Sequence, residues 1–187
     1  PWVVVVSLFL TAIVAGCSVF GQTLGDLNAA LSGRSGTMRS FDENSRVIDR
    51  IHGVSFRFAR DVRFDTSNSE GTNKDSAVVE ISLADSHIYH VGSTLVFAED
   101  GLVEITEGLP TSAQFTNSKP GSPWLNDVRE SFQNLWKGKA KTIMIRSQNG
   151  TPLAVYAGDA VEIFKTDIPK ATVFRVDGKY LLVYRAD

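Results

Sequence analysis

The sequence contains a single cysteine, Cys17, among its 187 residues. One cysteine cannot form an intramolecular disulfide or supply a site built from several thiolates. The charges nearly cancel, with a formal net charge of −2 at pH 7, whereas nucleic-acid binding usually shows a strongly basic face. The sequence also lacks a Gly-x-Ser-x-Gly elbow, a His-Glu-x-x-His motif and a phosphate-binding loop. We therefore predict no catalytic residue, no metal site, no cofactor and no nucleic-acid partner.

Charge is missing altogether from Trp2 to Gly16, and most of this segment is apolar. A run of this length matches the h-region of a secretory signal peptide better than a membrane span, which needs about 20 residues. The run ends in Val14-Ala15-Gly16-Cys17, which resembles the bacterial lipobox. The resemblance implies cleavage between Gly16 and Cys17 and a diacylglycerol on the cysteine sulfur. An ordinary cleaved signal peptide and an uncleaved anchor or buried core segment are the alternatives.

The lipobox interpretation divides the chain into three parts. They are a signal peptide, a short lipid-proximal tether and one globular domain, at 1–16, 17–23 and 24–187. Because Pro1 is not a methionine and no basic residue precedes Trp2, we expect the sequence to be truncated at its start. Two acyl chains hold a protein stably at a membrane, so Cys17 would anchor the domain to the extracytoplasmic face of a bacterial cell membrane.

Two segments show helical periodicity. Leucines at i, i+3 and i+7 from Leu24 to Leu31 predict a short amphipathic helix, which packs on the domain or lies on the lipid surface. A long amphipathic helix is predicted over 122–138, because Ser-Pro opens this segment and a glycine closes it. Its apolar residues fall within an arc of about 120° at 100° per residue, which leaves the opposite face for water.

The remainder of the domain has the texture of β-structure. Strands are expected over 37–41, 46–51, 54–58, 62–64, 77–83, 88–91, 95–98, 142–146, 152–156, 161–164, 172–176 and 179–184, with polar loops over 66–76 and 106–121. The Asn149-Gly150 and Asp177-Gly178 pairs predict tight hairpins. The predicted fold is α+β and β-dominated. It is an antiparallel curled sheet or small barrel with the long helix packed on it and a short N-terminal helix.

Three strings follow one another in a characteristic order along the chain: LGDLNAAL at 24–31, LVFAEDGL at 95–102 and LAVYAGD at 153–159. Together they resemble an uncharacterised family of Gram-positive surface lipoproteins known as a domain of unknown function. The resemblance spans almost the whole mature chain and implies a lipobox protein on a Gram-positive membrane. It implies no activity, so no catalytic residue is transferred from it.

Two local groups imitate catalytic or metal sites. Asp85 and His87 share one face of a strand while His90 points to the other, so a metal site lacks its third ligand. We interpret the histidines as surface or hydrogen-bonded groups. Glu99 and Asp100 offer the two carboxylates that glycoside hydrolysis needs, but carboxylates beside a glycine are typical of turns.

Two basic stretches are candidates for a weak binding surface. One holds seven arginines and four acids from Arg34 to Arg63, and the other is a lysine cluster after Trp136. The candidate residues are Arg57, Arg60, Arg63, Lys137, Lys139 and Lys141. They would contact an anionic membrane, at about 1 kcal/mol per charge, or acidic wall polymers. The alternative is that they form the solvated face of strands.

These observations favour a non-enzymatic, lipid-anchored surface domain that binds an envelope component or a partner protein. A small cell-envelope hydrolase with a non-local active site and a carrier of an apolar ligand are the alternatives. A wide apolar cavity would favour the carrier, and two converging carboxylates with a raised pKa would favour the hydrolase. An exposed aromatic or basic patch without a pocket would favour the binding domain.

Overall fold

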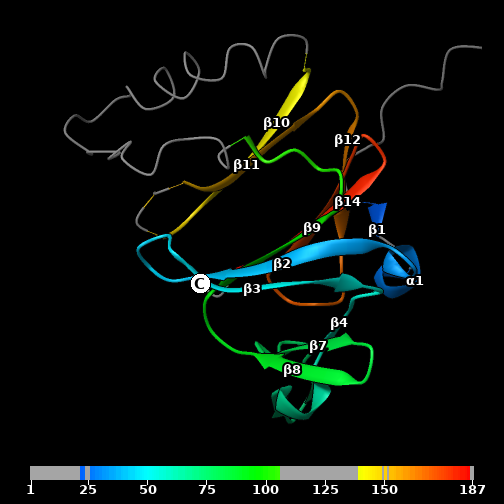
Figure 1. Ribbon diagram of the computed structural model, residues 1–187. Helices are drawn as coiled ribbons and strands as arrows, with labels where there is room; N and C mark the ends of the chain where they lie inside the picture. The colour runs from blue at the N-terminus through cyan, green and yellow to red at the C-terminus, as the bar shows by residue number, and fades with distance from the viewer. Residues whose placement is uncertain (1–21, 24–25, 106–138, 149, 151, 186–187) are drawn as a thin grey trace, which may run out of the picture.

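A central seven-stranded sheet forms the middle of the domain in the computed structural model, which describes residues 22–23, 26–105, 139–148, 150 and 152–185 (Figure 1). From edge to edge its strands are β1 (Gln22–Thr23), β12 (Val161–Lys165), β13 (Ala171–Val176), β14 (Lys179–Tyr184), β9 (Thr94–Glu99), β2 (Ser35–Phe41) and β3 (Val47–Val54). Neighbouring strands are antiparallel, except that β1 runs parallel to β12.

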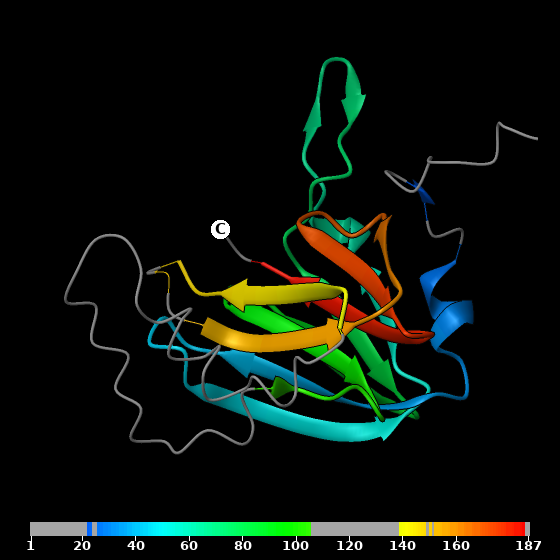
Figure 2. The same ribbon diagram turned by 90° about the horizontal axis from the view of Figure 1, so that it is seen from above.

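Smaller sheets cover both faces of the central sheet, so the domain has three layers (Figures 1 and 2). One face carries the hairpin of β10 (Lys141–Arg146) and β11 (Pro152–Gly158). The other carries the antiparallel sheet of β4 (Arg57–Arg60), β7 (Val79–Leu83) and β8 (Ser86–His90). A two-stranded hairpin of β5 (Ser67–Asn68) and β6 (Gly71–Thr72) projects away from the layers (Figure 2).

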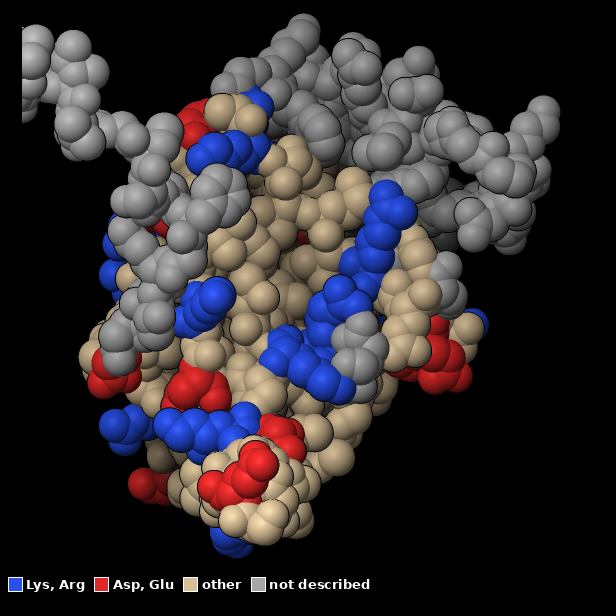
Figure 3. Space-filling model, turned by 180° about the vertical axis from the view of Figure 1, so that it is seen from behind, with Lys and Arg blue, Asp and Glu red and all other residues tan. Residues whose placement is uncertain are grey.

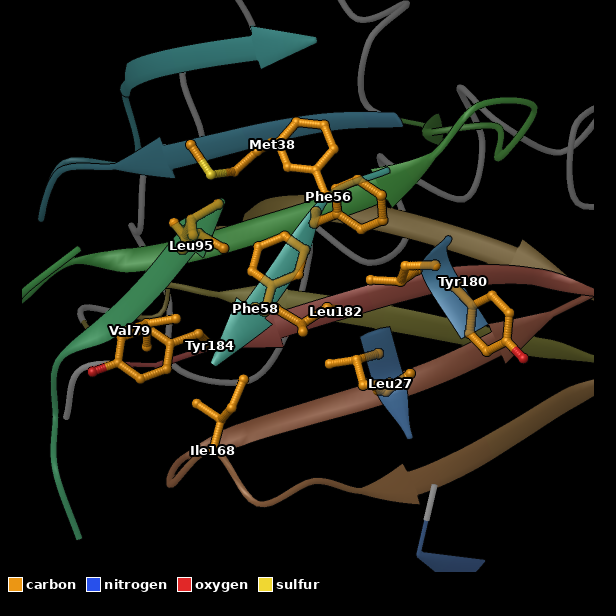
Figure 4. Packing of buried hydrophobic residues seen from close by; sticks show 14 of the residues in the cluster. Leu27, Met38, Phe56, Phe58, Val79, Leu95, Ile168, Tyr180, Leu182 and Tyr184 are labelled. Atoms are coloured by element: carbon orange, nitrogen blue, oxygen red, sulfur yellow. The ribbon is translucent and has the colours of Figure 1, made fainter. Parts of the chain in front are cut away.

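The middle strands of the central sheet are buried on both faces, because each face supports a separate core. Along β9, Leu95 and Phe97 point into the core beneath the β4–β7–β8 sheet, whereas Val96 points into the core beneath β10–β11. In the first core, the Phe97 ring lies 5.0 Å from the Phe56 ring and 5.4 Å from the Phe58 ring, centroid to centroid. Figure 4 shows these aromatic and aliphatic side chains converging from both sheets.

The short N-terminal helix is confirmed as α1 (Leu27–Leu31), and it packs on the domain. Asp26 caps it by accepting hydrogen bonds from the backbone N–H groups of Asn28 and Ala29. Leu27 and Leu31 are buried in the first core, so the alternative of a lipid-surface helix is not supported. The long helix predicted over 122–138 lies outside the described residues.

One face of the last strand, β14, lies in the first core. Tyr180, Leu182 and Tyr184 share this face. Burial raises the pKa of the Tyr184 hydroxyl, which donates a hydrogen bond to the carbonyl of Ala77 at 2.6 Å. The sequence pattern alone does not show that the opposite face of β14 is buried as well.

Two predictions about the β-structure are wrong. The strand expected over 62–64 is a 3-10 helix, η1 (Val62–Phe64), because the Asp61 carboxylate accepts a hydrogen bond from the Arg63 N–H and closes the turn. The barrel alternative also fails, since β1 and β3 each pair on one side only in the described part of the chain. The smaller sheets lie against the faces instead of closing the edges. No helix among the described residues is long and apolar enough to span a bilayer.

Candidate binding surface

The β4–β7–β8 sheet has one face in the core and one face in solvent. Phe58, Val79 and Ile81 point into the core, so the alternate residues of each strand point outward. We call the solvent side the outer face. It consists of Arg57, Ala59, Glu80, Ser82, His87 and Tyr89. Two residues of η1 join it: Arg63, which lies against Tyr89, and Phe64, whose ring also contacts the Arg63 guanidinium.

An arginine stands between two exposed aromatic rings on this face. The Arg63 guanidinium carbon lies 5.5 Å from the centroid of the Tyr89 ring and 5.9 Å from that of the Phe64 ring. Tyr89 is 51% exposed and Phe64 is 57% exposed, although large aromatic side chains are usually buried. The three side chains form an exposed patch that combines a cation with apolar surface.

Asp61 fixes the position of Arg63. The Asp61 carboxylate accepts hydrogen bonds from the Arg63 backbone N–H at 3.0 Å, from Nε at 2.9 Å and from Nη2 at 2.6 Å. These side-chain hydrogen bonds lower the pKa of Asp61 and raise the pKa of Arg63. Both groups therefore remain charged over the physiological pH range. A bidentate contact of this kind holds the planar guanidinium in one orientation.

The two neighbouring histidines point to opposite faces, as the strand alternation predicts. On the outer face, His87 Nδ1 lies 2.9 Å from Glu80 Oε1 and 3.2 Å from Ser82 Oγ. On the inner side, His90 Nε2 lies 2.8 Å from the carbonyl oxygen of Ser93. No group of three or more metal-ligating side chains occurs within the described ranges.

The predicted basic residues do not form one surface. Arg57 is exposed on the outer face, but Arg60 is turned inward, where its Nε lies 3.1 Å from an oxygen of Asp65 and its side chain is 9% exposed. Lys139 and Lys141 lie at β10, on the far side of the central sheet (Figure 1). Lys137 falls outside the described residues, as do Gly16 and Cys17.

Each of the two described lysines of this cluster already has a partner in the domain. Lys139 Nζ donates to Asp159 at 2.8 Å and to Asp177 at 3.3 Å, and the first of these hydrogen bonds is the main cause of its raised pKa. Lys141 Nζ donates to the carbonyl of Val161 at 3.2 Å. These contacts tie the β10–β11 hairpin to the ends of β12 and β13. Both lysines therefore have a structural role.

Glu99 and Asp100 point to different sides of the sheet and do not converge. Burial acts to raise the pKa of Glu99, but hydrogen bonds from the Tyr180 N–H, Lys179 and Arg34 outweigh it and lower the pKa. Asp100 is exposed, and hydrogen bonds from Ser35 and His52 lower its pKa. A hydrolase would need a carboxyl group with a raised pKa, and neither group supplies one.

A small polar cavity lies between β2, β3 and the segment after β9. Its volume is about 200 Å³, and Arg39, Arg50, Glu104 and Tyr156 line it. The guanidinium of Arg39 forms a buried ion pair with Glu104 and donates a hydrogen bond to the Tyr156 hydroxyl at 2.9 Å. Ligand pockets usually enclose about 300–1,000 Å³ and are mostly apolar. This cavity therefore does not match the apolar-ligand carrier. Its ion pair holds Glu104 against β2 of the central sheet.

Sequence reasoning missed Phe64 and Tyr89. It assigned Phe64 to a strand, and it had no reason to place Tyr89 beside an arginine 26 positions earlier in the chain. The available signal was local: Val62, Phe64, Tyr89 and Val91 are large apolar residues beside polar ones, and all four are more than half exposed. The contact between the Arg63 guanidinium and the Tyr89 ring shows that η1 lies against β8.

The chain belongs to the family described as Domain of unknown function (DUF5052), whose model matches residues 2–187. This confirms that the chain belongs to an uncharacterised family that spans nearly its whole length. No curated protein and no solved structure matches the chain.

Proposed function

We propose that this member of the DUF5052 family is a non-enzymatic surface lipoprotein that binds a partner protein through its outer face. In this proposal a signal peptidase cleaves between Gly16 and Cys17, and the lipidated cysteine anchors the domain on the extracytoplasmic side of a Gram-positive membrane. Support for the anchor comes from the lipobox-like string at the end of an uncharged apolar run. Support for the binding role comes from the outer face.

The observation that carries the binding role is Arg63 between Phe64 and Tyr89. Interface hot spots are enriched in Tyr and Arg, and they gather where aromatic rings can be fully desolvated. An isolated domain gains nothing from keeping two aromatic rings more than half exposed. A partner that covers both rings would gain about 25 cal/mol for each Å² of apolar surface that is buried.

The geometry favours a protein over a polysaccharide as the partner. The Arg63 guanidinium lies over both rings, so a ligand here meets a cation together with two ring surfaces rather than a purely aromatic platform. The half-exposed rings and the charge of Arg63 suit the mixed apolar and polar contacts of a protein interface. Asp61 has already ordered Arg63, so binding avoids the cost of immobilising that side chain, about 0.5–1.5 kcal/mol.

A site-specific crosslink tests this proposal. A photoreactive amino acid replaces Tyr89 in the full chain, expressed in its own cells, and the matched control replaces Ile48, which is 58% exposed on β3. We expect one discrete crosslinked product at position 89 and none at position 48. The partner identified in that crosslinked product is then used in a binding assay. There Arg63→Ala should weaken its affinity at least tenfold, since truncating a hot-spot arginine costs about 2 kcal/mol or more.

The proposed role fails if both positions give the same products, or if Arg63→Ala leaves affinity unchanged. It also fails if the purified lipoprotein turns over a wall glycan while no specific partner is recovered. Circular dichroism of the Arg63→Ala variant serves as the folding control. The Arg63 side chain is 66% exposed, but the Asp61 carboxylate that it pairs with is 4% exposed, so the unfolding midpoint should fall while the spectrum below the transition stays that of the wild type.

A further inference from the structure

The point where the tether meets the domain is fixed by β1. Gln22 pairs with Phe164 and Thr23 pairs with Lys165, so the chain enters the domain along the outer edge of β12. Five residue steps separate Cys17 from Gln22. A residue step spans at most about 3.5 Å, so these five steps allow a distance of at most about 18 Å between the Cα atoms of Cys17 and Gln22. A lipid on Cys17 would therefore keep the β12 edge close to the headgroups, and would do so more tightly than it holds any distant part of the domain.

The surface around this edge is basic. Lys165 and Lys170 are exposed, and neither has an ion-pair partner among the described residues. The backbone N–H of Arg185 donates to the Lys170 carbonyl at 3.2 Å, but the Arg185 side chain lines a pocket with Phe41 and Arg146 on another part of the surface. Asp167, in the same turn, is the nearest acid along the chain. Figure 3, the view from behind Figure 1, shows Lys and Arg side chains across the middle of the molecule, with acidic side chains beside and below them.

An apolar side chain accompanies the two lysines. Ile163 and Lys165 lie two positions apart on β12, so they project to the same side of the strand. Ile163 is 43% exposed. Basic residues beside an exposed aliphatic group are typical of surfaces that lie at the boundary between headgroups and acyl chains.

We propose that the β12 edge rests on an anionic bilayer, with Lys165 and Lys170 contacting lipid headgroups and Ile163 at the headgroup boundary. This inference rests on the proposed lipid anchor at Cys17. It gives the anchored domain a fixed orientation. The β4–β7–β8 sheet then lies beside the membrane-facing edge and not on it (Figure 1), whereas the β5–β6 hairpin projects from the same side as the β12 edge (Figure 2).

The expected effect of the lysines is measurable. A basic residue near an anionic surface contributes about 1 kcal/mol, which is about fivefold in an equilibrium. Replacing both Lys165 and Lys170 by glutamine should therefore reduce the population of the docked orientation, relative to the free one, by about 25-fold. Neutral lipids should have a similar effect on the wild type.

Fluorescence quenching in vesicles tests the orientation. The lipidated full-length protein is reconstituted in vesicles of phosphatidylcholine with about 30% phosphatidylglycerol and a small fraction of headgroup-spin-labelled lipid. Because Cys17 is consumed by the lipid, an introduced cysteine can be labelled alone, in Asp167→Cys beside the two lysines or in Asn44→Cys at the β2–β3 turn. The matched charge control is Arg46→Gln with Arg50→Gln, which removes two cations at the opposite edge of the central sheet.

We expect strong quenching at position 167 and weak quenching at position 44. Quenching at 167 should be lost in Lys165→Gln/Lys170→Gln and in pure phosphatidylcholine, and kept in the arginine control. Equal quenching at positions 44 and 167 would overturn the docked orientation. So would quenching at position 167 that is unchanged in Lys165→Gln/Lys170→Gln. A label in Ser69→Cys, at the tip of the β5–β6 hairpin, adds a third arm. Quenching there without quenching at 167 would mean that the domain stands on the hairpin, which also overturns the proposal.

Mass spectrometry of the same preparation separates the two proposals. A bare Cys17 thiol would contradict the lipid anchor, and it would also contradict the docked orientation, which depends on that anchor. A lipidated Cys17 without quenching at 167 would contradict the docked orientation alone.

Discussion

Glu99 accepts hydrogen bonds from three donors that lie in two other segments of the domain. Its side chain is 4% exposed and lies at the end of β9. It accepts hydrogen bonds from Arg34 Nη1 at 2.8 Å, from Lys179 Nζ at 3.0 Å and from the Tyr180 backbone N–H at 2.9 Å. Glu99→Gln keeps the shape of the side chain but places an NH2 group where one oxygen accepts. At least one of the three donors then faces another donor.

The size of the destabilisation by Glu99→Gln follows from these contacts. Hydrogen bonds to a charged group contribute about 1.5–3 kcal/mol each when they are buried. Arg34 and Lys179 are 39% and 43% exposed, so solvent screens their share and the two ion pairs add little. The buried bond to the Tyr180 N–H keeps most of its value. We expect Glu99→Gln to lower the free energy of unfolding by about 2–3 kcal/mol at pH 7.

The effect should depend on pH in a defined direction. The pKa of Glu99 is lowered in the folded protein, so its contribution is fully present above the pKa of the unfolded chain, about 4.3. The contribution is lost as the pH falls below that value and through the lower folded pKa. The difference between wild type and Glu99→Gln should therefore be constant from pH 6 to 8 and shrink steadily below about pH 4.3.

Urea denaturation at several pH values measures this difference. With a slope of about 2 kcal/mol per molar urea, the midpoint should fall by about 1 M or more at pH 7. Glu162→Gln is the matched control, because its partner Arg175 and Glu162 itself are 40% and 38% exposed and such pairs contribute less than about 1 kcal/mol. The reasoning is refuted if the two variants have equal midpoints, or if the loss in Glu99→Gln grows toward acid pH.

Two further stability predictions concern the first core and the short helix. Phe97→Ala removes a fully buried ring in contact with Phe56 and Phe58, and it should lower the free energy of unfolding by about 3–5 kcal/mol; a loss under about 1 kcal/mol in urea denaturation would contradict the packing. Asp26→Ala removes the cap of α1, whose oxygen accepts two backbone N–H groups, and should cost about 1 kcal/mol. Asp26→Asn should restore most of that loss, and no recovery in the same assay would speak against capping.

Local chemistry explains which parts of the fold the sequence predicts well. The hairpin at Asp177-Gly178 has positive φ at both residues, 48° and 82°, which these two residue types tolerate. Strands β10 and β11 pair on either side of the predicted Asn149-Gly150 turn. Alternation also places His87 and His90 on opposite faces correctly. Each of these predictions depends only on neighbours along the chain.

The layered arrangement depends on contacts between distant segments, and there the sequence is insufficient. The β9 strand lies between β2 and β14, and β14 follows it by about 80 positions. A strand buried on both faces shows a continuous apolar run in place of alternation, so Leu181 to Val183 does not reveal which side is core. The aromatic side chains around Arg63 could not be brought together from the sequence either. Their contact joins η1 to β8, and Arg63 and Tyr89 are 26 positions apart in the chain.

The membrane anchor is the premise on which both the location and the docked orientation depend, and the mature N-terminus tests it most directly. Intact mass and peptide sequencing of the protein extracted from cell membranes should show Cys17 as the first residue, with a diacylglycerol on its sulfur. In the Cys17→Ala variant this species should be absent. A free Cys17 thiol, or a chain that still carries residues 2–16, would contradict the account.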